Sequence, residues 1–264
     1  MSYLSPILAR KRREIERRRR HGARAPQRAD RHGDDAARSA LRRPDGALPR
    51  VIAEVKFRSP SAGPIRPWAP GDAVRIGRGY ADGGASAVSV LCDGPGFGGS
   101  ALSLRRVARA VAPTPVLFKE FVLDPLQIEL AARCGARLIL LLVCALDDEA
   151  LAELVDVSLA RGLEPVVEAA SEAELERALA TSARILGINA RDLTSFDVDP
   201  GRAERLVEKI PSDRVAVYMS GMSSAEDLRT VARGRADAVL VGSGLMRAPE
   251  PGAALRGWLE EAGA

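Results

Sequence analysis

From residue 51 onward, short apolar runs alternate eight times with amphipathic stretches. The runs are rich in Val, Ile and Leu, as strands are, and apolar residues in the stretches recur at the helical period of 3.6. We expect strands at residues 51–56, 86–91, 115–118, 136–142, 163–168, 184–188, 214–219 and 236–241. We expect helices near residues 72–82, 101–111, 124–133, 147–160, 171–180, 201–208, 224–232 and 253–262.

Eight strand–helix units match the size of a (β/α)8 barrel, which typically takes about 250 residues. The rival is an open doubly wound sheet, which usually shows a glycine-rich loop after its first strand. Here the first run leads through Glu54-Val55-Lys56 into Ser59-Pro60, which is no such loop. We therefore predict an α/β fold of the (β/α)8 TIM-barrel type.

The first fifty residues differ sharply in charge from the rest. They hold fifteen Lys and Arg against six Asp and Glu, a balance of +9, whereas the whole chain is +4, so residues 51–264 carry −5. The basic run could bind nucleic acid, but it has little aromatic interleaving. We favour an amphipathic helix that touches the body of the protein, and expect no nucleic-acid partner. Its apolar residues are Leu4, Ile7, Leu8 and Ile15.

Residues 21–48 are rich in Arg, Asp, Ala, Gly and Pro, which is typical of a linker or a poorly ordered stretch. The predicted division is therefore a basic N-terminal helix and linker over residues 1–48, followed by a catalytic barrel over residues 49–264.

Several features indicate a cytoplasmic protein. No apolar run is long enough to cross a bilayer, and the basic start lacks the apolar core of a signal peptide. The three cysteines show no CxxC pairing, which indicates free thiols in a reducing compartment. Both histidines, His21 and His32, precede the barrel. We expect no metal and no cofactor, and proton transfer in the barrel falls to Lys, Glu, Asp, Tyr or Cys.

Lysine is scarce: the chain has four lysines against thirty-five arginines. Two of them, Lys56 and Lys119, end strand-like runs and have Glu54 and Glu120 close by. Arginine stays charged, whereas a buried lysine can give up a proton and act as an acid or base. The alternative is that both are ordinary surface lysines. Their positions at the ends of strand-like runs, close to glutamates, make that interpretation the weaker one.

In a barrel, catalytic residues come from the carboxyl ends of different strands. The last two expected strands end in Ser220-Gly221 and Gly242-Ser243, where backbone N–H groups can approach an anion, so we predict a phosphorylated substrate. Arg191 can hold a carboxylate, or pair structurally with Asp192 or Asp197. The polar residues at these ends are Glu54, Lys56, Ser59, Lys119, Glu168, Asn189, Arg191, Ser220 and Ser243.

Over residues 51–248, these features resemble the indole-3-glycerol phosphate synthase family, whose N-terminal extension is similar to the basic helix expected here. The matching motifs are Ile52-Ala53-Glu54-Val55-Lys56 with Ser59-Pro60-Ser61, Val88-Ser89-Val90-Leu91 with Phe97-Gly98-Gly99-Ser100, Pro115-Val116-Leu117 with Lys119 and Phe121, Glu168, Gly187-Ile188-Asn189 with Arg191 and Leu193, Ser220-Gly221, and Val241-Gly242-Ser243 with Leu245-Met246.

The resemblance implies an enzyme that closes an indole ring. It converts 1-(2-carboxyphenylamino)-1-deoxyribulose 5-phosphate, with loss of carbon dioxide and water, and needs no cofactor or metal. The resemblance makes Lys119 the principal acid and Glu168 its acid/base partner. It implies that Lys56 and Arg191 hold the substrate carboxylate, that Glu54 and Asn189 orient them, and that the remaining substrate-binding residues are Ser59, Phe97, Ser220, Gly221, Gly242 and Ser243.

The chain departs from the family pattern at five positions. Cys92 replaces a Thr, Gly96 an aromatic residue, Glu120 an Asp, Ala190 an Asn and Met219 a Glu. Two alternatives therefore stay open: a divergent homologue that acts on a modified anthranilate-derived substrate in a specialised pathway, or a non-catalytic homologue that binds a phosphate ligand. An aminosugar-phosphate isomerase is a third, but the expected Cys or Asp acid/base pair is missing. The expected partners are a phosphorylated small molecule and other tryptophan-pathway enzymes, without a membrane.

Overall fold

The computed structural model describes residues 4–22, 33–60, 62–192 and 197–263. Ser61 and Leu193 of the family motifs lie outside the described residues, as do His32 and residues 23–32 of the expected linker.

Eight parallel strands close into a barrel, in which β1 pairs with both β10 and β4. This confirms the predicted (β/α)8 TIM barrel, and each strand lies within a few residues of its expected place. The strands are β1 (Arg50–Val55), β4 (Ala87–Leu91), β5 (Val116–Lys119), β6 (Leu138–Leu142), β7 (Glu164–Ala169), β8 (Ile185–Asn189), β9 (Val215–Met219) and β10 (Ala238–Val241). Two short strands, β2 (Arg58–Ser59) and β3 (Gly63–Pro64), form a small antiparallel pair in the loop after β1.

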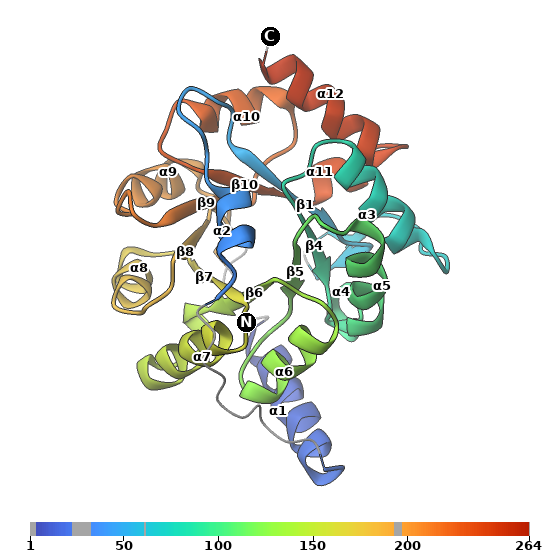
Figure 1. Cartoon of the computed structure of the whole chain (residues 1–264), viewed down its shortest axis with the longest axis vertical. Helices are drawn as coiled ribbons and strands as arrows, with labels where there is room; N and C mark the ends of the chain where they lie inside the picture. The colour runs from blue at the N-terminus through green and yellow to red at the C-terminus, as the bar shows by residue number, and fades with distance from the viewer. Residues whose placement is uncertain (1–3, 23–32, 61, 193–196, 264) are drawn as a thin grey trace.

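Helices surround this ring of strands (Figure 1). Most begin at a Ser or Asp side chain that accepts a backbone N–H of the first turn, as Ser100, Asp147 and Ser171 do. The outer helices are α3 (Asp72–Asp82), α5 (Ala101–Val111), α6 (Pro125–Arg133), α7 (Asp148–Ala160), α8 (Glu172–Leu179), α9 (Pro200–Glu208), α10 (Ala225–Ala232) and α12 (Pro251–Gly263). Shorter segments follow three strands: α4 (Gly94–Phe97), the 3₁₀ turn η1 (Val143–Ala145) and α11 (Ser243–Met246).

Alternation along the strands separates two apolar cores. On β9, Val215 and Val217 pack with the barrel interior, whereas Ala216 and Tyr218 pack against the surrounding helices. The interior core is lined mostly by Leu, Val and Ile, and the outer core joins the strands to the helices. Polar side chains at the carboxyl ends of the strands therefore sit above a packed apolar floor.

The basic N-terminal helix is confirmed as α1 (Leu4–Arg20). Leu4, Leu8 and Ile15 are buried, as expected, and Ile7 is half-buried. The same face also buries Lys11, which the sequence analysis did not single out.

The expected linker is wrong for its described second half, because residues 35–41 form a helix, α2 (Asp35–Leu41). Asp34 caps this helix and pairs with Arg137, which precedes β6. Ala37 and Leu41 pack against the interior core at the amino ends of the strands, and α2 lies across the ring of strands in Figure 1. The charged composition of this segment is typical of an exposed linker, but Asp34 and Asp35 pair with arginines at the amino ends of the strands. The division at residue 49 stays a prediction.

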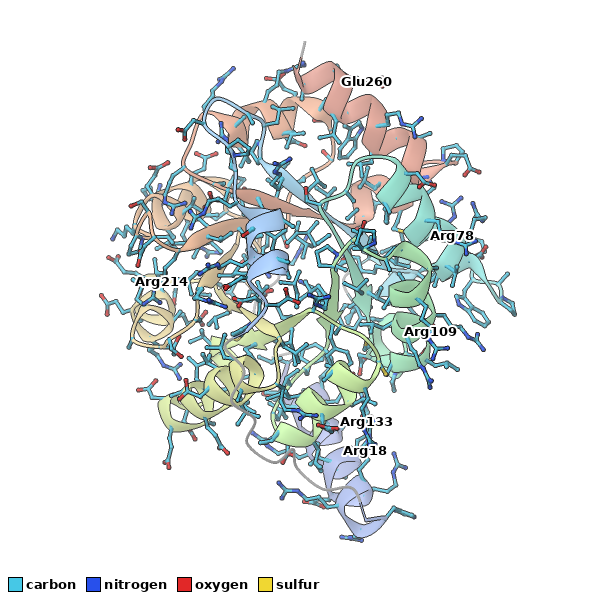
Figure 2. All side chains as sticks on the ribbon, viewed as in Figure 1. Arg18, Arg78, Arg109, Arg133, Arg214 and Glu260 are labelled. Atoms are coloured by element: carbon cyan, nitrogen blue, oxygen red, sulfur yellow. The ribbon has the colours of Figure 1, made fainter. Side chains whose placement is uncertain are left out.

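Most of the side chains labelled in Figure 2 are arginines. The labelled Arg18, Arg78, Arg109 and Arg133 extend outward from four different helices. Within the described residues, no helix combines the length and the apolar character needed to cross a bilayer.

Candidate active site

The carboxyl ends of the strands surround a cavity of about 330 Å³. That volume suits a small-molecule ligand. All twelve site residues proposed from the sequence line this one cavity: Glu54, Lys56, Ser59, Phe97, Lys119, Glu168, Asn189, Arg191, Ser220, Gly221, Gly242 and Ser243.

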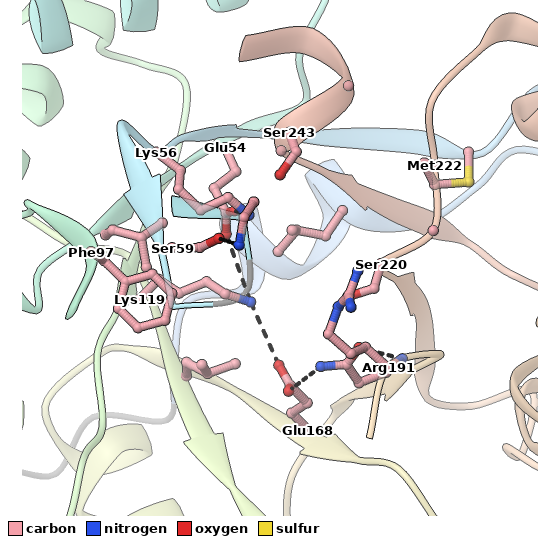
Figure 3. A pocket seen from close by; sticks show the side chains of 18 of the residues that line it. Glu54, Lys56, Ser59, Phe97, Lys119, Glu168, Arg191, Ser220, Met222 and Ser243 are labelled. Carbon is pink, nitrogen blue, oxygen red and sulfur yellow. Dashed lines mark hydrogen bonds and ion pairs between the residues drawn. The ribbon is translucent and has the colours of Figure 1, made fainter. Parts of the chain in front are cut away.

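Two lysines and two glutamates form a continuous line of charge across the cavity (Figure 3). The Lys56 ammonium lies 2.7 Å from Glu54 Oε1, and Lys119 Nζ lies 3.9 Å from Glu54 Oε2 and 3.5 Å from Glu168 Oε2. Burial alone would raise the pKa of Glu54, but the charges of Lys56 and Lys119 outweigh it, and this pKa lies below its ordinary value. Glu54 is therefore ionised at neutral pH and holds both ammonium groups in place.

Glu168 is fixed from one side and open on the other. Its Oε1 accepts a hydrogen bond of 2.7 Å from Asn189 Nδ2, and Asn189 Oδ1 in turn accepts the Arg191 backbone N–H at 2.9 Å. Glu168 Oε2 and Glu54 Oε2 are buried without a hydrogen-bond partner among the described residues. Buried oxygens of this kind normally find a donor. Each forms an ion pair with Lys119 Nζ without a hydrogen bond, so a donor group of a ligand can still bind to either oxygen.

The turns after β9 and β10 bring backbone to the opposite side of the cavity. Ser220 has a positive φ of 72°, a conformation that non-glycine residues rarely adopt and that tends to cluster at functional sites. A Cβ on Gly242 would lie 2.5 Å from Glu54 Oε1 and 3.0 Å from Lys56 Nζ. A side chain at this position would therefore force Glu54 and Lys56 to shift, so glycine lets the β10 turn lie against them.

An aromatic and apolar wall completes the cavity. The Phe97 and Phe121 rings lie 6.0 Å apart, and Leu140, Leu142 and Leu240 also line the space. Phe121 follows Lys119 by two residues, and this spacing was the sequence signal that could have placed Phe121 in the cavity. Further lining residues were not proposed as site residues from the sequence, among them Ala62, Met222, Ser223, Gly244 and Arg247.

Among the departures from the family pattern, Glu120 alone of the five lines the described cavity. Met219 is 1% exposed and points into the barrel interior, where its sulfur lies 2.5 Å from the place of a Cβ on Gly187. Cys92 and Ala190 are buried, and burial raises the pKa of the Cys92 thiol. Gly96 donates its N–H to Asp93 and sits beside the cavity wall. The departures from the family pattern therefore change few of the residues that line the cavity.

A (β/α)8 barrel whose strand ends gather lysines, glutamates and an arginine around one cavity has the architecture of a TIM-barrel enzyme. The chain belongs to the indole-3-glycerol phosphate synthase family, whose model matches residues 4–257. An Opitutus terrae protein named indole-3-glycerol phosphate synthase is 45% identical over 218 residues, 81% of each chain. Indole-3-glycerol phosphate synthase 2 of Streptomyces coelicolor is 44% identical over 220 residues, 83% of each chain.

Solved structures agree on the fold. The 3-hexulose-6-phosphate synthase of Salmonella typhimurium has a TM-score of 0.64 at 15% identity, over 81% of this chain and 98% of that one. Tryptophan synthase subunit alpha of Legionella pneumophila has a TM-score of 0.59 at 15% identity, over 81% and 92%. At such identities the likeness shows the barrel alone.

Proposed function

We propose that this protein converts 1-(2-carboxyphenylamino)-1-deoxyribulose 5-phosphate to indole-3-glycerol phosphate, as a carboxy-lyase of tryptophan biosynthesis. The observation that carries the proposal is the position of Lys119, whose ammonium group lies in the cavity between the buried carboxylates of Glu54 and Glu168, within ion-pair distance of both. Family membership supports the same activity.

The cavity offers a distinct contact for each part of this substrate. Backbone N–H groups of Gly221, Gly242 and Ser243 would hold the phosphate, with Ser220 beside them. Lys56 and Arg191 would hold the carboxylate, because both project cations into the cavity. The aromatic ring would lie against Phe97 and the leucine floor, with Ser59 at the rim.

Ring closure begins when the aromatic carbon that bears the carboxylate attacks the sugar carbonyl. Lys119 donates a proton to the carbonyl oxygen, which becomes a hydroxyl group. The carboxylate then leaves as carbon dioxide, and its electron pair restores the aromatic ring. Departure of the hydroxyl as water needs a proton on oxygen and removal of a proton from carbon. Glu168 serves as this acid/base partner, and Asn189 orients it. A positioned acid or base contributes roughly 10²–10⁴-fold.

The departures favour the ordinary substrate over a modified one, because four of the five lie outside the described cavity lining. We further propose that the enzyme acts in the cytoplasm and contacts other enzymes of the tryptophan pathway.

The test is indole fluorescence from purified protein supplied with the carboxyphenylamino-deoxyribulose phosphate. We expect product with one carbon dioxide released per turnover. Absence of product, together with turnover of a ring-substituted analogue, would replace this proposal with the specialised-pathway alternative. Absence of product with every analogue would leave a phosphate-binding homologue.

A further inference from the structure

Lys11 of α1 is buried at the catalytic end of the barrel, with a side chain only 4% exposed. Its ammonium group lies 2.8 Å from Asp93 Oδ1, 2.9 Å from Glu120 Oε2 and 3.1 Å from Glu14 Oε2. Burial alone would lower the pKa of Lys11, but the carboxylates outweigh it and hold this pKa above its ordinary value. One charged group of the N-terminal helix therefore bridges two carboxylates that lie 27 positions apart along the barrel.

Asp93 lies two residues after the end of β4 and organises the turn that carries Phe97. It caps α4 by accepting the Gly96 backbone N–H at 2.7 Å, and it also receives Arg10 at 2.6 Å. Gly96 adjoins Phe97, whose ring lines the cavity. The orientation of this part of the cavity wall thus depends on a carboxylate that Lys11 holds.

Glu120 organises the neighbouring turn in the same way. It directly follows Lys119, and its Oε1 accepts the Phe121 backbone N–H at 2.8 Å while its Oε2 faces Lys11. The backbone that carries the central lysine and the second aromatic ring is therefore tied to the same ammonium group. Gln127 adds a bond to the Phe121 carbonyl oxygen, so the turn has little freedom once Glu120 is held.

We propose that Lys11 is a positioning residue, whose ammonium group fixes the β4–α4 and β5–α6 turns against each other at the mouth of the barrel. The N-terminal helix then belongs to the active site although its side chains do not line the cavity. Bonds to charged groups in low-dielectric surroundings are stronger than neutral ones. The two turns carry Phe97 and Phe121, whose rings lie 6.0 Å apart in the cavity wall.

The first experiment measures amide hydrogen exchange by mass spectrometry, which needs no catalytic activity. The Lys11→Met variant keeps the length of the side chain and removes its charge. We expect peptides that cover residues 93–98 and 119–123 to exchange at least about tenfold faster, because hydrogen bonds to charged groups contribute roughly 1.5–3 kcal/mol. Peptides from residues 220–223 and 242–245 should stay unchanged. The control is Arg13→Met, an exposed position on the same helix with the same change of charge.

If Lys11→Met fails to fold, the Glu120→Gln variant tests the same link. Its amide oxygen still accepts the Phe121 N–H, but it no longer offers Lys11 a charge. We expect faster exchange over residues 119–123 and not over 93–98, since Asp93 keeps its own contact with Lys11. If the variant folds and both of its turns exchange at the same rates as in the wild type, the inference is overturned.

The second experiment is kinetic and rests on the proposed function. We expect Lys11→Met to lower kcat/KM for the carboxyphenylamino-deoxyribulose phosphate about tenfold, because small displacements of reacting groups are costly. The inhibition constant of inorganic phosphate should not change, since its proposed site lies on the turns after β9 and β10. A parallel loss of phosphate binding would indicate general loosening and refute a positioning role. Inactive wild-type protein would instead refute the proposed function, and hydrogen exchange would still decide the role of Lys11.

Discussion

The four lysines occupy two kinds of environment. Lys11, Lys56 and Lys119 are buried or half-buried near the mouth of the barrel, each beside carboxylates. Lys209 is half-exposed on the outside and pairs with Glu172. Since all but four of the 39 Lys and Arg residues are arginine, the placement of lysine carries information at the scale of single residues.

Lys119→Met should reduce kcat about 10²–10⁴-fold, the usual contribution of one positioned acid. The melting temperature should change little, because Glu54 retains its ion pair with Lys56 and Glu168 retains its hydrogen bond from Asn189. The measurement is steady-state indole formation beside a thermal melt. Lys209→Met is the matched control and should behave as wild type. A Lys119→Met enzyme with a tenth or more of the wild-type kcat would remove this residue from the role of principal acid.

Met219→Glu should lower the melting temperature at pH 8 more than Met219→Gln does. The position is 1% exposed, and a carboxylate there resists ionisation. The gap between the two variants should shrink as the pH falls toward the ordinary glutamate pKa of about 4.3. Thermal melts at several pH values give the comparison. A stable, more active Met219→Glu enzyme would show instead that the site lysines accept a third carboxylate.

At the scale of elements, the turn after β10 connects the charged line to the proposed phosphate site. Gly242→Ala should raise the inhibition constant of inorganic phosphate, because the new Cβ would displace Glu54 and Lys56. Gly257→Ala in α12 is the control, since its Cβ would meet nothing within 4 Å. Competition assays against substrate measure both. Unaltered phosphate inhibition in Gly242→Ala would place the anion elsewhere in the mouth.

The short helix α2 closes the barrel from its amino end, and Leu41 is fully buried in the interior core. Leu41→Ala should destabilise the protein by about 2–5 kcal/mol, the usual range for this change in a core. Urea unfolding measures the loss, and kcat of the folded protein should be retained because the site lies at the opposite end. Leu102→Ala, at a 54% exposed leucine, is the control. Equal stability of the two variants would mean that α2 merely covers the barrel.

The sequence predicted some elements far better than others. The strands were readable because both of their faces are buried, so that each is a short continuous apolar run. The outer helices were readable because one buried face repeats apolar residues with the helical period. The helix α2 was missed because it spans seven residues, with two of them buried. Lys11 was readable in part, since it follows Leu4 and Leu8 at helical spacing, but its partners Asp93 and Glu120 come from distant turns. The gathering of polar residues in one cavity followed from strand ends, and their expected roles came from the family resemblance, whereas the aromatic pairing needed the fold.

Across the whole molecule, two buried aspartates tie the N-terminal segment to the barrel at opposite ends. Asp34 pairs with Arg137 at the amino end, and Asp93 pairs with Lys11 at the carboxyl end. Burial alone would raise the pKa of each aspartate, but the paired cations and the backbone N–H groups outweigh it, so both values lie below the ordinary range. Burial raises the pKa of Glu120 and Glu164 above the ordinary value.

These shifts predict an optimum in stability as the pH is varied. A carboxyl group with a lowered pKa stabilises the fold above its unfolded pKa, about 3.9 for aspartate, and the gain is lost as pH falls through the folded value. Glu120 and Glu164 act in the opposite sense, because their contribution is lost as pH rises through their raised pKa. The free energy of unfolding should therefore fall steeply below about pH 4.

The double variant Asp34→Asn with Asp93→Asn isolates the acid side of this profile. Asparagine still caps both helices, since its side-chain oxygen accepts the same N–H groups, but it carries no charge to titrate. We expect lower stability at pH 7 and a shallower decline between pH 4 and pH 3, measured by urea unfolding at each pH. Asp45→Asn, at an exposed position, should follow the wild-type curve. A double variant whose decline runs parallel to wild type would show that other carboxylates carry the acid sensitivity, and that the two ends of the barrel are joined to the N-terminal segment mainly by apolar packing.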